Sequence, residues 1–312
     1  RVRFQDAGHI LGSASIEVWL TENSVTKKIV FSGDLGQPGR LIVRDPTPIK
    51  EADVLLVEST YGNRLHKTID DTKAELLKAI DDTFNRKKGN VIVPAFALGR
   101  TQELIFMLLQ LTIEGKLKNI NVFIDSPLGS KATKITLDNL ESLDDETRKL
   151  VHEMRSGKHP IHIRFTETVE DSMALNEIHS GAIIIAGSGM CDAGRIKHHL
   201  KHRLGHKQNS ILFAGYQGEG TLGRRIVDRA PIVNIYGDDI RVAADIYTLG
   251  GLSAHGDQRA LLDWLGHVSP APKQTFIVHG EQSTMQIFSE KITGELGWKP
   301  TLPKIGSSYE IA

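Results

Sequence analysis

The sequence that decides the fold lies near the end of the chain: LSAHGD at residues 252–257 and FIVHGE at residues 276–281. His279 follows a short run of β-branched and aromatic residues, which predicts a position at the carboxyl end of a strand. His255 lies in a turn just before helical periodicity begins near residue 260. Loops framed by glycine often carry binding or catalytic groups. One such histidine alone more often has no role, so the prediction of a site depends on partners elsewhere.

Three earlier residues occupy the same kind of position. His9 lies in the glycine-flanked loop AGHILGS, and Asp34 follows a strand-like run in SGDLG. Glu58 follows the apolar run ADVLLV, where a carboxylate is not expected to point into the core unpaired. Because α/β proteins build their sites at strand ends, we expect these three residues to join the two histidines.

Helical patterns alternate with short apolar strands between about residue 63 and residue 250. This alternation predicts βαβ units and a parallel sheet covered on both faces, which is an α/β fold. The expected strands are 16–20 and 28–32 (a hairpin), 52–57, 90–94, 121–125, 161–165, 182–186, 210–214, 232–236, 244–249, 276–278 and 307–311. The expected helices are 68–87, 99–113, two pieces across 130–153, 171–179, 192–204 and 220–229, with one more after His255.

The composition restricts the class of protein. The 312 residues include 38 Lys+Arg and 38 Asp+Glu, so any binding of a polyanion must depend on a local basic patch. The single cysteine, Cys191, fits a reducing compartment. No apolar run reaches the ~18 residues that span a bilayer, and we see no charged-then-apolar stretch that resembles a signal peptide. We therefore expect a soluble, cytoplasmic protein with no membrane partner.

The five residues at strand ends suit a metal-dependent hydrolase. His9, Asp34 and His279 offer two imidazoles and a carboxylate, which are suitable zinc ligands. A carboxylate can also bridge two metals in a two-metal site. His255 would then be a general acid, with Glu58 holding it by a charge-assisted hydrogen bond. Spacing alone does not establish this chemistry.

Several ordered motifs resemble one known family along nearly the whole chain. The family is the β-CASP branch of the metallo-β-lactamase-fold RNA-processing nucleases, which includes the endonuclease subunit of the mRNA cleavage and polyadenylation factor and its bacterial and archaeal relatives. The motifs that carry the resemblance are AGHILGS (7–13), SGDLG (32–36), VESTYG (57–62), PAFALGRTQEL (94–104), DSPL (125–128), GSGM (187–190) with GR (194–195), SAHGD (253–257) and VHGE (278–281).

The resemblance implies a fold and roles for particular residues. Residues 1–62 and 251–312 would form part of a metallo-β-lactamase αββα core, and residues 63–250 would form the inserted β-CASP domain over an RNA cleft. His9 would bind one of two zinc ions, Asp34 would bridge both, and His279 would bind the second. Glu58 would hold His255, which protonates the leaving oxygen of an RNA phosphodiester.

One motif of the family is missing. The family has a His-x-His-x-Asp-His loop upstream of the His9 motif, which supplies further metal ligands. Neither HPIH at 159–162 nor HHLKH at 198–202 reproduces it, and both lie in the insert. Strand-like alternation also starts directly at Arg1. We interpret the chain as N-terminally truncated, with zinc bound weakly or not at all and the nuclease activity belonging to the intact parent.

Candidate RNA contacts lie in glycine-containing loops that precede helices. A helix N-terminus attracts anions, and a basic stretch runs from Arg195 to Arg203. The alternative is a solvated helix face, which is the usual meaning of such runs. His198, His202 and His206 have metal-compatible spacing but are expected to be surface residues. The candidate substrate-binding residues are Ser188, Gly189, Met190, Arg195, Arg100, Gly220 and Thr221.

Two other functions fit parts of the pattern. A non-catalytic RNA-binding or scaffold protein of the same fold would fit the loss of the histidine-rich loop, but the retained Glu58, His255 and His279 argue against it. A small-ester metallo-hydrolase would not need a long insert with basic loops. The sequence does not define the RNA that is cut, the direction of cleavage or the oligomeric state, for which a homodimer is one possibility.

Overall fold

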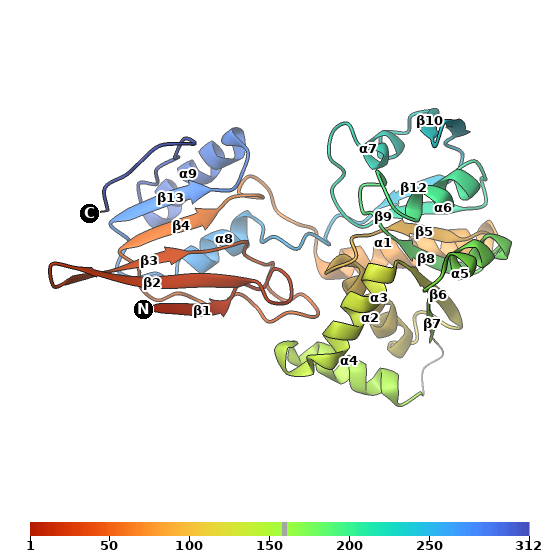
Figure 1. Ribbon diagram of the computed structural model, residues 1–312, viewed down its shortest axis with the longest axis horizontal. Coiled ribbons are helices and arrows are strands. Elements are labelled where there is room, and N and C mark those ends of the chain that lie inside the picture. Colours follow the sequence, from red (N-terminus) through yellow and green to blue (C-terminus); the bar gives the residue numbers. More distant parts are fainter. Residues whose placement is uncertain (158–160, 312) are drawn as a thin grey trace. The chain divides into compact units, whose positions relative to one another are not determined.

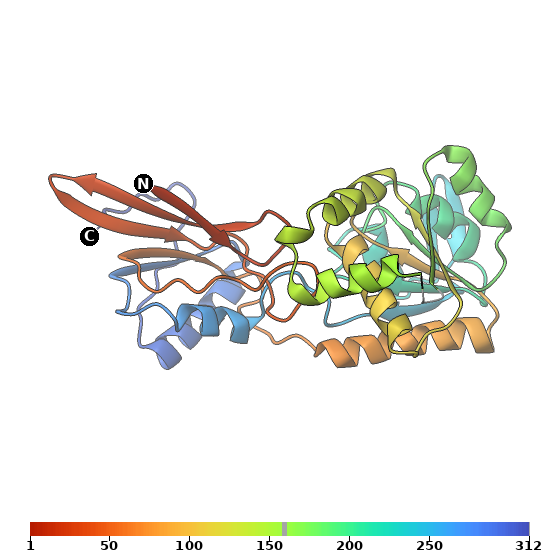
Figure 2. The ribbon, with the colours of Figure 1, turned by 90° about the horizontal axis from the view of Figure 1, so that it is seen from below.

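A computed structural model describes residues 1–157 and 161–311 of the chain. The chain divides into two compact units, Arg1–His66 together with Ser253–Ala312, and Lys67–Leu252 (Figures 1 and 2). Each is described by itself below. Two residues of the HPIH stretch, His159 and Pro160, lie outside the described residues. The limits expected for the family's domains, 1–62, 63–250 and 251–312, stay predictions.

The first unit contains a five-stranded mixed sheet in the order β1-β2-β3-β4-β13. The first three strands are antiparallel neighbours, and β4 pairs in parallel with both β3 and β13. The predicted hairpin is confirmed as β2 and β3. The strands are β1 (Val2–Asp6), β2 (Ala14–Glu22), β3 (Val25–Phe31), β4 (Val54–Glu58) and β13 (Gln274–Val278).

One face of this sheet is covered by α8 (Gln258–Leu265) and α9 (Gln282–Leu296), as Figure 2 shows. Alternate residues of a strand point to opposite faces, so Val30, Leu55 and Ile277 share the covered face. They form one buried cluster with apolar residues of both helices, among them Leu261, Leu265, Phe288 and Ile292. The hydrophobic stripe of each helix is thus buried against the sheet.

The opposite face is apolar and partly exposed. A row of aligned residues crosses all five strands: Phe4, Ile16, Phe31, Leu56 and Phe276. The side chains of Phe4 and Phe31 are 67% and 40% exposed. The prediction of a strand at 307–311 is wrong, because this segment has no ladder and contacts the sheet by other means. The ring of Tyr309 packs on Phe276 at 4.9 Å between centroids.

The second unit is a six-stranded parallel sheet in the order β12-β9-β5-β8-β6-β7. The α/β prediction is confirmed, and the strands end within a few residues of their expected limits. They are β5 (Val91–Pro94), β6 (Ile120–Asp125), β7 (Ile161–Phe165), β8 (Ala182–Ala186), β9 (Ser210–Phe213) and β12 (Asp245–Thr248), with a separate hairpin of β10 (Ile232–Ile235) and β11 (Asp238–Arg241).

Helices cover both faces of this sheet, which explains the continuous apolar runs in its strands. One face packs with α1 and α2, and the other with α6 and α7. Five of these helices are capped by a side chain that accepts a hydrogen bond from a backbone N–H: Thr68, Ser126, Asp144, Thr168 and Thr221. The helices are α1 (Ile69–Asp81), which continues as a π-helical turn to Arg86, α2 (Arg100–Ile113), α3 (Pro127–Asp138), α4 (Asp145–Arg155), α5 (Val169–Ala174), α6 (Ile196–Arg203) and α7 (Leu222–Val227). Over the part of the chain that the structure describes, no helix has the length and hydrophobicity to span a bilayer.

Candidate active site

Five side chains predicted from the sequence converge at one edge of the first unit's sheet. Glu58 is the last residue of β4, and His279 follows β13 directly. Asp34 lies in the loop after β3, which runs parallel to both of these strands. His9 follows β1, and His255 lies in the turn before α8. The carboxyl ends of the three parallel strands therefore bring segments together that are more than two hundred residues apart.

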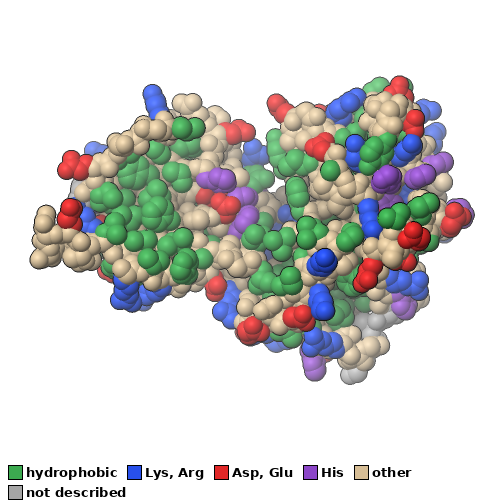
Figure 3. Space-filling view, in the orientation of Figure 1, with side chains coloured by type: hydrophobic (Ala, Val, Ile, Leu, Met, Phe, Trp, Pro, Cys, Tyr) green, Lys and Arg blue, Asp and Glu red, His purple; other side chains and the backbone are tan. Residues whose placement is uncertain are grey.

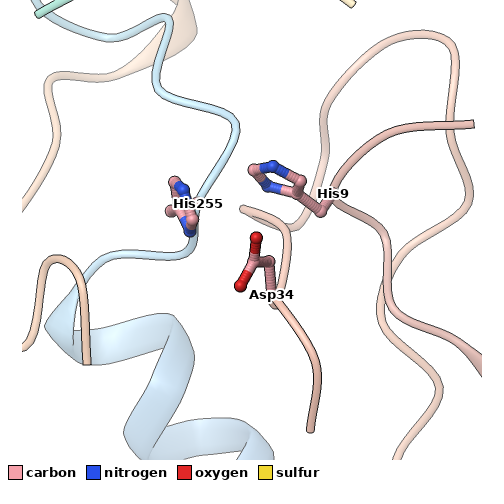
Figure 4. Close-up of side chains that lie close together, drawn as sticks. All are labelled: His9, Asp34 and His255. Carbon is pink, nitrogen blue, oxygen red and sulfur yellow. The ribbon is translucent and has the colours of Figure 1, made fainter. Parts of the chain in front are cut away.

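His9, Asp34 and His255 form the closest group, with one ligand atom from each lying within 4.8 Å of the others. Figure 4 shows these three side chains pointing toward one another. His279 Nε2 lies 3.6 Å from Asp34 Oδ1. The closest group thus includes His255, the predicted acid, whereas the predicted ligand His279 lies beside it. Which of the histidines bind metal stays a prediction.

The donor set fits a divalent metal ion. His9 Nδ1 is buried and has no hydrogen-bond partner among residues 1–157 and 161–311, which is costly unless a cation or another group satisfies it. Burial is the main cause that lowers the pKa of His9, with the charge of His255 adding to it, so the neutral ligand form is favoured. Asp34 and His279 are partly exposed, as an open catalytic site requires.

His255, a member of the closest group, forms a charge-assisted pair with Glu58. The Glu58 carboxylate is fully buried and accepts hydrogen bonds from Leu35 N–H at 2.6 Å and Thr60 N–H at 3.2 Å. His255 Nδ1 lies 3.1 and 3.2 Å from its two oxygens. Burial alone raises the pKa of Glu58, but the hydrogen bonds outweigh it and lower this pKa. The carboxylate is therefore ionised, and it holds His255 with Nδ1–H toward Glu58 and Nε2 available for proton transfer.

The contact that lowers the pKa of Glu58 raises the pKa of His255. Burial lowers the pKa of His255, but the hydrogen bond and the negative charge of Glu58 outweigh it and raise this pKa. The protonated imidazole is stabilised as a result, which is the form that a general acid needs.

Glycines allow the loops of the site to approach each other. Gly36 N–H donates to the carbonyl of Ala7 at 2.8 Å, and a Cβ on Gly36 would lie 1.7 Å from the carbonyl oxygen of Gly8. Any other residue at this position would push the Asp34 loop away from the His9 loop.

The predicted substrate-binding residues all lie in the second unit, in the loops that follow β8 and β9 or, for Arg100, at the first residue of α2 after the loop that follows β5. Gly189 is covered by the ring of Phe96, and the Met190 carbonyl accepts from Gly223 N–H. Thr221 caps α7, next to Gly220, with its hydroxyl oxygen. The Ser188 carbonyl accepts from Cys191 N–H within its own loop. Their role toward RNA stays a prediction.

The two predicted phosphate-binding arginines also bind protein groups. Arg100 forms an ion pair with Glu103. Arg195 donates to the fully buried Asp125 at 2.8 Å, and to the carbonyls of Glu167 and Thr168 at 3.1 and 3.0 Å. The guanidinium of Arg195 thus binds groups of the protein itself, and the sequence did not predict these contacts.

Sequence reasoning missed His66 and the contacts that it makes with His255 and Asp257 of the His255 turn. His66 Nε2 donates to the carbonyl of His255 at 3.0 Å, and its backbone N–H donates to Asp257 Oδ2 at 3.0 Å. An aspartate just before an apolar-striped helix is a recognisable N-cap, so the cap at Asp257 could have been found. The contact with His66 spans 191 residues and has no local signal.

The fold and the site define an α/β protein with a candidate metal centre and an adjacent carboxylate–histidine pair. Two family models match the chain: the Beta-Casp domain over residues 101–226, and the Zn-dependent metallo-hydrolase RNA specificity domain over residues 239–303.

Individual relatives agree with these models. The chain is 32% identical to Ribonuclease TTHA0252 of Thermus thermophilus, covering 99% of this chain and 69% of that protein. It is 31% identical to an RNase J-like protein of Methanocaldococcus jannaschii, covering 100% of this chain and 71% of the relative. It is also 30% identical to the transcription termination factor FttA of the same archaeon, over 94% of this chain and 47% of FttA.

The chain therefore belongs to the β-CASP family of metallo-β-lactamase-fold RNA-processing nucleases, as the motifs indicated. This family consists of zinc-dependent hydrolases specific for RNA, and the fold has the expected β-CASP domain. The chain spans about seven tenths of the first two relatives (69% and 71%) and about half of the third (47%).

Proposed function

We propose that the site hydrolyses phosphodiester bonds of RNA with the help of zinc. His9, Asp34 and His279 would hold the metal, with Asp34 between the two histidines. The observation that carries the proposal is the pair of the buried Glu58 with His255, because His255 also belongs to the metal-compatible group that includes His9 and Asp34. Together they provide a proton donor next to a place for a Lewis acid, as hydrolysis of a phosphodiester requires.

The protein's own residues would move the proton. When bound, zinc polarises the phosphate and lowers the pKa of water. Glu58 stays ionised and keeps Nδ1–H of His255 directed at itself. As a water oxygen bonds to phosphorus and the bond to the leaving oxygen breaks, His255 gives the proton on Nε2 to that oxygen, and the neutral imidazole that results keeps its hydrogen bond to Glu58. The partly exposed Asp34 and His279 leave the site open to a large substrate.

A cleavage assay with a matched histidine variant tests the proposal. The chain is incubated with zinc and an internally labelled single-stranded RNA, and compared with the His255→Ala and His267→Ala variants. His267 is exposed at the end of α8 and serves as the control. We expect His255→Ala to lower kcat by about 10²–10⁴-fold, the usual contribution of a general acid, and His267→Ala to have no effect.

The other outcomes separate the rival functions. Removal of zinc by a chelator should abolish cleavage, and its return should restore it. Cleavage that survives His255→Ala would overturn the role of this residue. Tight RNA binding without cleavage by the zinc-loaded wild type would favour a non-catalytic RNA-binding protein.

A further inference from the structure

The turn that carries His255, residues 253–257, is held by hydrogen bonds from two sides. On one side, Gly256 N–H donates to the Leu35 carbonyl at 2.7 Å, and Gln37 N–H donates to the Ala254 carbonyl at 3.2 Å. Gly36 and His255 thereby form an isolated antiparallel β-bridge. Because Leu35 N–H also donates to Glu58, the same short segment positions both members of the Glu58–His255 pair.

On the other side, the side chain of His66 reaches the backbone of His255 itself. Its Nε2 lies 3.0 Å from the His255 carbonyl, which can only accept, so Nε2 is the donor. The ring of His66 is packed edge-on against Tyr61 at 4.8 Å between centroids. The His66 donor is therefore fixed in direction by its own neighbour.

Asp257 joins these contacts to α8. It is 6% exposed and uses both carboxylate oxygens: Oδ1 accepts from Ala260 N–H at 2.9 Å, and Oδ2 accepts from His66 N–H at 3.0 Å. Its own N–H donates to Gln37 Oε1 at 2.8 Å. Capping of α8 needs only Oδ1, so the contact of Oδ2 with His66 goes beyond what a helix cap requires.

We propose that His66 and Asp257 are positioning residues, which hold the backbone of His255 so that its imidazole stays on Glu58. The inference rests on the function proposed above and assigns two residues that support its proton donor. Neither residue touches the Glu58 carboxylate, and both act through the backbone of the turn. Partners of this kind commonly contribute about 10–100-fold to activity.

Variants can separate the positioning contacts from general stability. His66→Leu removes the donor to the His255 carbonyl, whereas His66→Gln retains an amide N–H that can replace it. Asp257→Ser retains a good cap for α8 but loses the second acceptor. The exposed His267 and Asp263 provide the matched controls His267→Leu and Asp263→Ser in the same unit.

The first readout does not depend on activity. In metal-free protein labelled with ¹⁵N at histidine, the Nδ1–H signal of His255, assigned by its loss in His255→Ala, reports the bond to Glu58. We expect this signal to vanish by solvent exchange in His66→Leu and Asp257→Ser and to persist in His66→Gln and both controls.

The second readout is RNA cleavage by the zinc-loaded protein. We expect kcat to fall about 10–100-fold in His66→Leu and Asp257→Ser, with KM within about twofold, and to recover in His66→Gln. Unchanged Nδ1–H signals and kcat in His66→Leu and Asp257→Ser would overturn the proposal, and so would equal losses in His66→Leu and His66→Gln. If the wild type cleaves no RNA, the proposed function fails, and the Nδ1–H signal alone then decides whether the two residues position His255.

Discussion

Glu17 is a buried carboxylate on β2, on the same face of the sheet as Arg3 and Lys28. It forms an ion pair with Arg3 and another with Lys28 at 2.6 Å. Burial raises the pKa of Glu17, but the hydrogen bonds and charges of these two partners outweigh it and lower this pKa to about 2. The ionised carboxylate thus stabilises the first unit at neutral pH.

The pH dependence of stability follows from the direction of this shift. A carboxyl group whose pKa is depressed on folding stabilises the protein above its unfolded pKa of about 4.5, and this stabilisation is lost as the pH falls toward about 2. We expect Glu17→Gln to lower the free energy of unfolding at pH 7 by about 2–3 kcal/mol, and by much less near pH 2. Urea titrations at several pH values measure the difference. A cost that does not change with pH would contradict the assigned ionisation.

At the scale of elements, Asp125 joins three segments of the second unit. It ends β6, is fully buried, and accepts from His199 and Ser172 at 2.6 Å and from Arg195 at 2.8 Å. Thr166 also donates to it. Burial raises the pKa of Asp125, but these hydrogen bonds hold it well below its usual range. The contacts link β6 to α6 and its N-cap residue, and to α5 and the segment before it.

Loss of this charge should destabilise the second unit strongly. We expect Asp125→Asn to lower the free energy of unfolding by about 3–5 kcal/mol, because it leaves the Arg195 charge without its buried partner. The control is Asp145→Asn: this side chain is 81% exposed and pairs with Arg148, so its loss should cost less than about 1 kcal/mol. Chemical denaturation of both variants measures the two costs, and equal costs would show that Asp125 acts as an ordinary surface charge.

The sequence predicts features that have a local pattern, but it does not predict contacts between residues that are far apart in the chain. The strand expected at 52–57, observed as β4 (Val54–Glu58), and the parallel sheet followed from local apolar runs. The five residues of the candidate site were recognisable because each follows a strand or lies in a glycine-framed loop. The contacts of Asp125 with His199 and of Asp257 with His66 join residues 74 and 191 positions apart. No local pattern encodes such a pairing. The segment 307–311 was wrongly expected to be a strand, because the contact of the Tyr309 ring with Phe276 needs no ladder.

At the scale of the whole molecule, the apolar row on the first unit's sheet lies on the face opposite α8 and α9 and is partly exposed. Figure 3 shows hydrophobic side chains in a broad continuous area at the left of the view. Val2, Phe4 and Leu20 are 54%, 67% and 51% exposed, and Phe31 is 40% exposed. Contiguous apolar surface of this kind is uncommon on monomers and marks an interaction site. The homodimer considered from the sequence stays a prediction, and this face is where it can be tested.

We expect the isolated chain to self-associate through this face. The Phe4→Ser/Phe31→Ser double variant removes two aromatic rings from the row and should weaken association by about a hundredfold or more, since each buried side chain contributes about 1.5–3 kcal/mol. Ile135→Ser removes a side chain that is 57% exposed on α3 of the second unit, and it should leave association unchanged. Sedimentation velocity over a range of concentrations measures each constant. A wild-type chain that remains monomeric at high concentration would show that the row does not mediate contact between copies. Equal weakening by Ile135→Ser would place the contact on another surface, because α3 lies outside the unit that carries the row.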